Sequence, residues 1–155
     1  MKKLLAIVLA ACLALTLVAC GGAPSSTPAS GSASGSTAAA VSGDANVAVF
    51  YYTYSDTYIS SVRSALDAKL DEMGVTYQDF DGAGQQTTQT EQVKTAITNG
   101  ATVLLVNLVE TASDDAANEI VSAAKDADIA VIFFNREVSN DVVNSSEKCA
   151  FVGTD

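Results

Sequence analysis

Short apolar runs alternate with longer amphipathic stretches between residues 46 and 155. Runs rich in β-branched and aromatic residues predict buried strands, whereas apolar residues that recur every three or four positions predict helices. We therefore expect strands at the start of the 47–58 stretch and at 75–80, 102–106, 129–134 and 149–152. Amphipathic helices are expected at 59–73, from 88 through 97, and from about 114 through 124.

Local signals suggest where the helices begin and end. Gly74 follows the first helix in the place of a C-terminal glycine cap. Thr88 to Glu91 reads as a capping box that begins the second helix, and Thr111 and Asp114 resemble caps for the third. The stretch from residue 137 to 148 is expected to be a polar loop.

The order of these elements predicts the fold class. Three helices alternate with the first four strands, a loop leads to the fifth, and crossover connections between parallel strands are right-handed. We expect an α/β protein with an open, doubly wound parallel sheet whose strands, numbered along the chain, lie in the order 2-1-3-4-5.

The first 45 residues have a different character. Residues 1–19 combine two lysines with an apolar run too short to span a bilayer, which is typical of an export signal. The tetrapeptide 17–20 (L-V-A-C) resembles a bacterial lipobox, in which Cys20 would carry the lipid; the alternative is an ordinary secretory signal. Residues 20–45, rich in Gly, Ser and Ala, are expected to be a flexible linker. Residues 46–155 are expected to form the globular part, held by the lipid on the extracytoplasmic face of the membrane.

Composition narrows the possible functions. The chain carries 8 basic and 18 acidic residues, which argues against a nucleic-acid partner. It has no His, so His-based catalytic sets are excluded and the usual metal ligand is missing. After export and lipidation, Cys149 would be alone and could not form an intramolecular disulfide. The missing His therefore argues against an enzyme.

Polar residues follow the first and fourth predicted strands. Asp56 and Tyr58 end the first strand–helix junction, and Asn135 and Arg136 end the fourth strand. Ligands of open α/β sheets bind beyond the carboxyl ends of the strands, so these residues are candidates for a site. The alternatives are a helix cap for Asp56 and a polar turn for Asn135 and Arg136.

Other polar residues fit local structural roles better. Asp81 and Asn107, which follow the second and third strands, are expected to serve as turn or cap residues. The glycines at 82 and 84 are not a dinucleotide-binding motif, because position 87 is Thr and the turn follows the second strand. The acidic pairs 114/115 and 126/128 are expected to be solvated.

The candidate site suits a sugar. Carboxylate, amide and guanidinium groups together offer acceptors and forked donors for hydroxyl groups, and an aromatic ring suits the C–H face of a pyranose.

Four segments carry a family resemblance: V-A-V-F-Y-Y-T-Y-S-D-T-Y at 47–58, L-V-N-L-V at 105–109, V-I-F-F-N-R-E at 131–137, and F-V-G-T-D at 151–155. They resemble the amino-terminal lobe of the bacterial galactose/glucose-binding proteins, the substrate-binding components of sugar ABC importers. The resemblance implies that Asp56, Asn135 and Arg136 hydrogen-bond sugar hydroxyls. It also implies that Tyr58 stacks on the sugar ring and that Tyr52 lies at the cleft edge.

The resemblance leaves the sugar and the pathway open. That family usually has Phe at the position of Tyr58 and Lys at that of Arg136, and related pentose binders carry Arg after this strand. A hexose is favoured over a pentose. Partners would be an ABC permease or, alternatively, a chemoreceptor or membrane kinase that senses the sugar. Family members also have a second lobe with a calcium loop. The resemblance therefore implies that this sequence is a fragment and that it holds no cofactor, because the calcium loop belongs to the second lobe. A flavodoxin-like enzyme and a sugar-responsive repressor fit less well.

Overall fold

A computed structural model describes residues 45–153 of the chain. In chain order the elements are β1 (Asn46–Tyr51), α1 (Thr57–Met73), β2 (Thr76–Asp81), α2 (Gln86–Thr98), β3 (Val103–Val106), α3 (Asp115–Asp126), β4 (Ala130–Phe134), α4 (Asn140–Asn144) and β5 (Cys149–Val152). The predicted export signal (1–19), Cys20 and nearly all of the predicted linker (20–45) lie outside the described residues.

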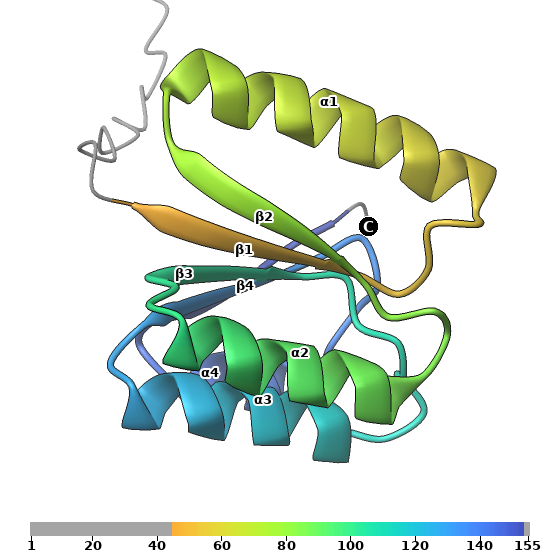
Figure 1. The fold of residues 1–155 in the computed structure, drawn as a ribbon. Helices are drawn as coiled ribbons and strands as arrows, with labels where there is room; N and C mark the ends of the chain where they lie inside the picture. The colour runs from red at the N-terminus through yellow and green to blue at the C-terminus, as the bar shows by residue number, and fades with distance from the viewer. Residues whose placement is uncertain (1–44, 154–155) are drawn as a thin grey trace, which may run out of the picture. The chain divides into compact units, whose positions relative to one another are not determined.

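The five strands form one parallel sheet in the order β2-β1-β3-β4-β5, which confirms the predicted fold class. The alternation of inward-facing residues places two cores on opposite faces of this sheet. Helices α2, α3 and α4 cover one face, and α1 lies alone over the other (Figure 1). Since all strands run the same way, the carboxyl ends of β1, β3 and β4 meet at one edge of the sheet.

Helix α1 begins and ends as its local sequence indicates. Asp56 is its N-cap, with extended backbone angles and a side chain that accepts the N–H of Ile59. Gly74 ends the helix in the left-handed conformation, at φ 67°, as expected for a glycine cap.

The predicted start of α2 is wrong. The helix begins at Gln86, two residues before the expected capping box, and Gln85 provides no side-chain cap. Thr88 is exposed, whereas Gln89 and Thr90 are buried. The first turn of α2 is held by side chains that reach the loop after β3, a long-range contact that local cap patterns do not report.

Two further differences concern the segments around β4. Asp114 is the N-cap residue of α3 but makes no capping bond; its carboxylate instead accepts the hydroxyl of Ser139 at 2.7 Å. The predicted polar loop contains α4, whose N-cap Ser139 accepts the N–H of Val142. Val142 is fully buried and Val143 packs against the same core, so this five-residue helix is held by apolar contacts and one cap rather than by helical periodicity.

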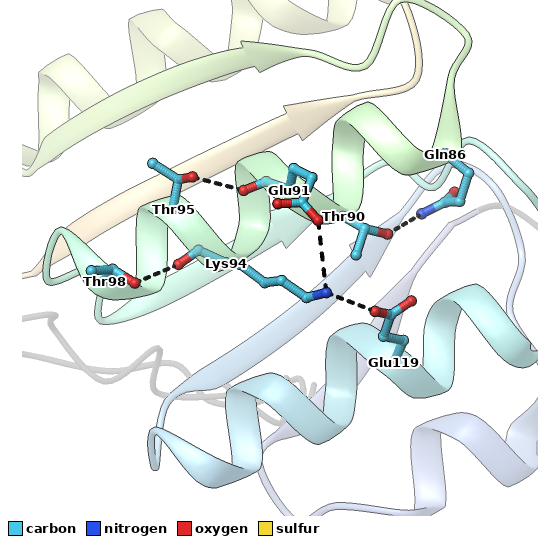
Figure 2. A network of polar contacts seen from close by, with 7 residues as sticks. All are labelled: Gln86, Thr90, Glu91, Lys94, Thr95, Thr98 and Glu119. Carbon is cyan, nitrogen blue, oxygen red and sulfur yellow. Dashed lines mark hydrogen bonds and ion pairs between the residues drawn. The ribbon is translucent and has the colours of Figure 1, made fainter.

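Helices α2 and α3 also meet through surface charges (Figure 2). Lys94 lies between Glu119 of α3, at 3.0 Å, and Glu91 one turn earlier, at 4.0 Å. Thr95 and Thr98 return their hydroxyls to backbone carbonyls of their own helix. Exposed pairs of this kind contribute little to stability, so the buried apolar contacts beneath them hold the two helices together.

Candidate functional site

Asp56 combines a capping role with a place in the candidate site. One carboxylate oxygen accepts the Ile59 N–H at 2.9 Å, and the other accepts the Tyr52 hydroxyl at 2.6 Å. Both expectations for this residue are therefore compatible, since each carboxylate oxygen can accept a second bond. The cap fixes where the carboxylate points.

These bonds tune both acids. The Tyr52 hydroxyl and then the Ile59 N–H lower the pKa of Asp56 below its ordinary value. The same hydrogen bond raises the pKa of Tyr52. Near neutral pH the pair therefore consists of a carboxylate and a neutral phenol, and the carboxylate retains acceptor capacity for a ligand hydroxyl.

The turn after β4 places Asn135 and Arg136. Asn135 adopts a left-handed backbone, at φ 65°, and its N–H donates to the carbonyl of Val152 at 3.0 Å. Asn is one of the few residues that tolerate this conformation, and here it lets the chain turn sharply while its side chain stays exposed.

Arg136 is fixed by backbone and by an aromatic ring. Its Nη1 donates to the carbonyls of Leu108 and Val109, at 2.8 and 2.6 Å. Its guanidinium lies 4.8 Å from the centre of the Tyr52 ring, within range of a cation–π interaction. Within residues 45–153, the other guanidinium nitrogens make no hydrogen bond to the protein.

The structure thus links three of the five candidate residues into one array. Tyr52 touches Asp56 through its hydroxyl and Arg136 through its ring. The side chain of Tyr58, in the first turn of α1, is 63% exposed and makes none of these contacts. Asn135 lies next to Arg136, but its backbone N–H donates to Val152 and not to the array. That all five side chains contact a ligand stays a prediction.

A hollow of about 500 Å³ lies beside this array, at the carboxyl ends of β3 and β4. Arg136 lines it together with Leu108, Ser113, Asp114 and Ser139. Asp56, Tyr58 and Asn135 do not line it. We therefore place the candidate site at the array itself, where a carboxylate acceptor and a guanidinium donor are both held in place.

Asn107 is the residue that the sequence analysis undervalued. It was expected to be a turn or cap residue, yet it is fully buried and its side chain bonds to the ends of both β1 and β4. A polar residue directly after the apolar run of β3 was the available signal. Asp81, by contrast, is a turn residue as expected: its carboxylate accepts the N–H groups of Tyr54 and Ala83.

Of the two glycines after β2, Gly82 serves close packing and Gly84 supplies a left-handed backbone turn. A Cβ on Gly82 would lie 2.9 Å from both the Tyr51 carbonyl and the Val109 side chain, and the Gly82 N–H donates to that carbonyl at 2.8 Å. Gly84 has φ 68° and donates its N–H to Tyr52. These contacts explain both glycines without a nucleotide.

Comparison with known proteins identifies the family of the chain. A family model described as a periplasmic binding protein domain matches residues 47–155. The chain belongs to the periplasmic binding protein family. The resemblance noted in the sequence is thereby confirmed at the level of the family.

Three relatives define the similarity further. The chain is 33% identical, over 76% of its length, to the D-galactose/methyl-galactoside binding periplasmic protein MglB of Haemophilus influenzae. A solute binding protein of an ABC transporter from Bacillus halodurans, with bound myo-inositol, superposes with a TM-score of 0.63 at 26% identity over 74% of this chain. The arabinose-binding protein of Shewanella sp. ANA-3 shares the fold, at a TM-score of 0.55 and 20% identity over 62% of this chain.

The chain spans only about a third of these relatives: 35%, 37% and 32% of their respective lengths. Within residues 45–153, no helix is long and apolar enough to cross a membrane. The same residues bring no three Asp, Glu, Cys or His side chains together in a metal-binding arrangement.

Proposed function

We propose that this chain forms the amino-terminal lobe of a sugar-binding component of an ABC importer. The array of Asp56, Tyr52 and Arg136 at the carboxyl ends of β1 and β4 carries the proposal. It holds an ionised acceptor and a forked donor in fixed positions, which is what recognition of a polyol requires. The proposed role is binding rather than catalysis, because hydrogen bonds to hydroxyls need no reacting group.

The proposed ligand is a hexose such as galactose or glucose. The identity to a D-galactose/methyl-galactoside binding protein supports this choice. Solved relatives with bound inositol and arabinose make a cyclitol or a pentose the alternatives. Asn135 and Tyr58 would contribute an exposed amide and an exposed ring beside the array.

Titration of the 20–155 chain by NMR with galactose, glucose, arabinose and myo-inositol tests the proposal. A single wall leaves part of the ligand in water, so we expect saturable binding weaker than about 1 mM, strongest for a hexose. Asp56→Ala should weaken it at least about tenfold, because partner hydroxyls lose a charged acceptor. Asp126→Ala, at the far end of α3, is the matched control. Shifts that are the same for every sugar, or unaffected by Asp56→Ala, contradict the proposal.

We also propose that Cys20 carries a lipid that anchors the lobe beside the permease. The lipobox-like sequence at 17–20 supports this proposal. In the full-length precursor, Cys20→Ser should abolish incorporation of a labelled fatty acid, whereas Cys149→Ser should leave it unchanged. Equal labelling of the two variants would show that the anchor lies elsewhere.

A further inference from the structure

Two fully buried side-chain amides lie beneath the candidate site. Gln89 belongs to the first turn of α2, and Asn107 directly follows β3. Both have an exposed fraction of 0%. An amide buried at this depth is costly unless its donors and acceptors are paired, so the partners of these two residues indicate what they do.

The Asn107 side chain joins two strand ends. Its Oδ1 accepts the N–H of Tyr52 at 3.2 Å, and its Nδ2 donates to the carbonyl of Phe134 at 3.2 Å. Its backbone N–H donates to Phe50 at 2.7 Å. Tyr52 belongs to the array, and Phe134 lies two residues before Arg136. The Asn107 side chain therefore sets the spacing between the strand end that carries Tyr52 and the one that carries Arg136.

Gln89 holds the loop after β3, whose carbonyls bind the Arg136 guanidinium. Its Nε2 donates to the Asn107 carbonyl at 3.0 Å, and its Oε1 accepts the Val109 N–H at 3.0 Å. The carbonyls of Leu108 and Val109 in this same loop accept Nη1 of Arg136. The position of the guanidinium therefore depends on a loop that the Gln89 side chain holds through two hydrogen bonds, one on either side of Leu108.

We infer that Asn107 and Gln89 are positioning residues, which fix Tyr52 and Arg136 for ligand contact without touching the ligand themselves. The inference rests on the proposed function, since Tyr52 and Arg136 are binding residues only within it. An amide is needed at both places because each side chain donates one hydrogen bond and accepts another. A carboxylate or an aliphatic side chain of the same size satisfies one of these bonds or neither.

The chain contains only two arginines, which permits a direct test. Arg63, on α1, has its guanidinium carbon 3.9 Å from the centre of the Tyr54 ring, and it serves as an internal reference for Arg136. Because two carbonyls hold Nη1 of Arg136, its guanidinium protons should exchange slowly with water. The measurement is the ¹⁵N NMR exchange rate of both guanidinium groups in the sugar-free chain.

Gln89→Met keeps the length of the side chain and removes both hydrogen bonds. We expect the Arg136 protons to exchange about tenfold faster, with Arg63 unchanged. Gln92→Met is the matched control: Gln92 lies on the same helix and bonds to the Asp81 carbonyl at 2.8 Å, away from Arg136. It should leave both arginines as they are.

Asn107→Leu provides the second variant and should change the Arg136 signals and the Tyr52 amide signal together. If either variant unfolds, Gln89→Glu, which keeps the acceptor for Val109 and loses the donor, gives the same comparison. Unchanged Arg136 exchange in the folded variants overturns the inference, and so does equal acceleration at Arg63, which indicates general loosening. Since no sugar is present, absence of sugar binding by the wild-type chain would count against the proposed function alone.

Discussion

Leu104 and Leu105 are neighbours on β3, the central strand, but their surroundings differ. Leu104 points toward α2 and α3 and is fully buried, whereas Leu105 points toward α1 and stays partly exposed. The difference extends over the sheet, because three helices cover one face and α1 alone covers the other (Figure 1). A hollow of about 460 Å³ beside α1, lined by Leu66, Leu105, Ile132 and Phe134, marks the uncovered part.

Polar groups follow the same division. Beneath α2, the side-chain amides of Gln89 and Asn107 are paired at both ends. Beneath α1, the Tyr51 hydroxyl and one oxygen each of Asp67 and Asp79 are buried without a hydrogen-bond partner within the described part of the chain. Gln92 contributes a fourth such atom on the α2 side. The side covered by three helices therefore holds its polar side chains in fixed positions. Among the described residues, the α1 side keeps buried polar atoms whose desolvation no hydrogen bond offsets.

The largest expected effect is a loss of stability, and it tests the difference between the two faces of the sheet directly. Leu104→Ala should lower the free energy of unfolding by about 3 kcal/mol, since it opens a cavity in a closed core. Leu105→Ala should cost less than half as much, because its side chain already meets solvent and the site can relax. Urea denaturation of both variants measures the difference. Equal losses would mean that both faces are packed alike.

At Asp79 we expect a smaller effect of opposite sign: a substitution that raises the free energy of unfolding. Burial, and then the neighbouring Asp67 carboxylate, raises its pKa to about 6. A raised carboxyl pKa means that the folded state binds the proton more tightly, so stability should fall as pH rises from about 4 to 6. Asp79→Asn should remove this fall. It should stabilise the fold by about 1 kcal/mol at pH 7, a value reduced for the partial exposure of the group.

Denaturation curves at pH 4 and pH 7 provide this measurement. Asp67→Asn should flatten the pH dependence as well, because it removes the neighbouring charge, and exposed Asp126→Asn should not. A wild-type stability that rises between pH 4 and 6 would show that other carboxylates dominate.

The smallest effect concerns Asp56 at the start of α1, whose pKa is lowered, whereas that of Asp79 is raised. The Tyr52 hydroxyl is the main cause of the lowered pKa of Asp56. Tyr52→Phe should therefore raise that pKa toward its ordinary value, with the Ile59 N–H still holding part of the shift. Carboxyl ¹³C NMR titration reports Asp56 and Asp79 in one experiment. An unchanged Asp56 titration in Tyr52→Phe would exclude the hydrogen bond.

The fold was predictable because its signals are local. Each strand is a compact apolar run, and alternation with helices leaves few ways to order a parallel sheet. The start of α2 and the whole of α4 escaped prediction because a contact with the 107–110 loop fixes the first, and the second is too short to show a period.

The geometry of the candidate site was predictable only in part. Asp56, Asn135 and Arg136 follow strands, which is a positional signal. Their connection depends on contacts between segments 28 residues apart, such as the bond from Arg136 to the Leu108 carbonyl. Asn107 was assigned a turn or cap role for the same reason, since nothing beside it in sequence reveals that two other strands end at its side chain.

The sheet order also leaves two strands, β2 and β5, with only one neighbour each among the described residues. Strand β2 carries Asp79 and Asp81, charges that discourage another chain from pairing with it. Strand β5 reads C-A-F-V, has no charge, and exposes 62% of Val152. Intermolecular strand pairing in concentrated solution should therefore begin at β5. Light scattering should show association that grows with concentration and that a lysine in place of Ala150 suppresses; scattering unaffected by that change would assign the association to another surface.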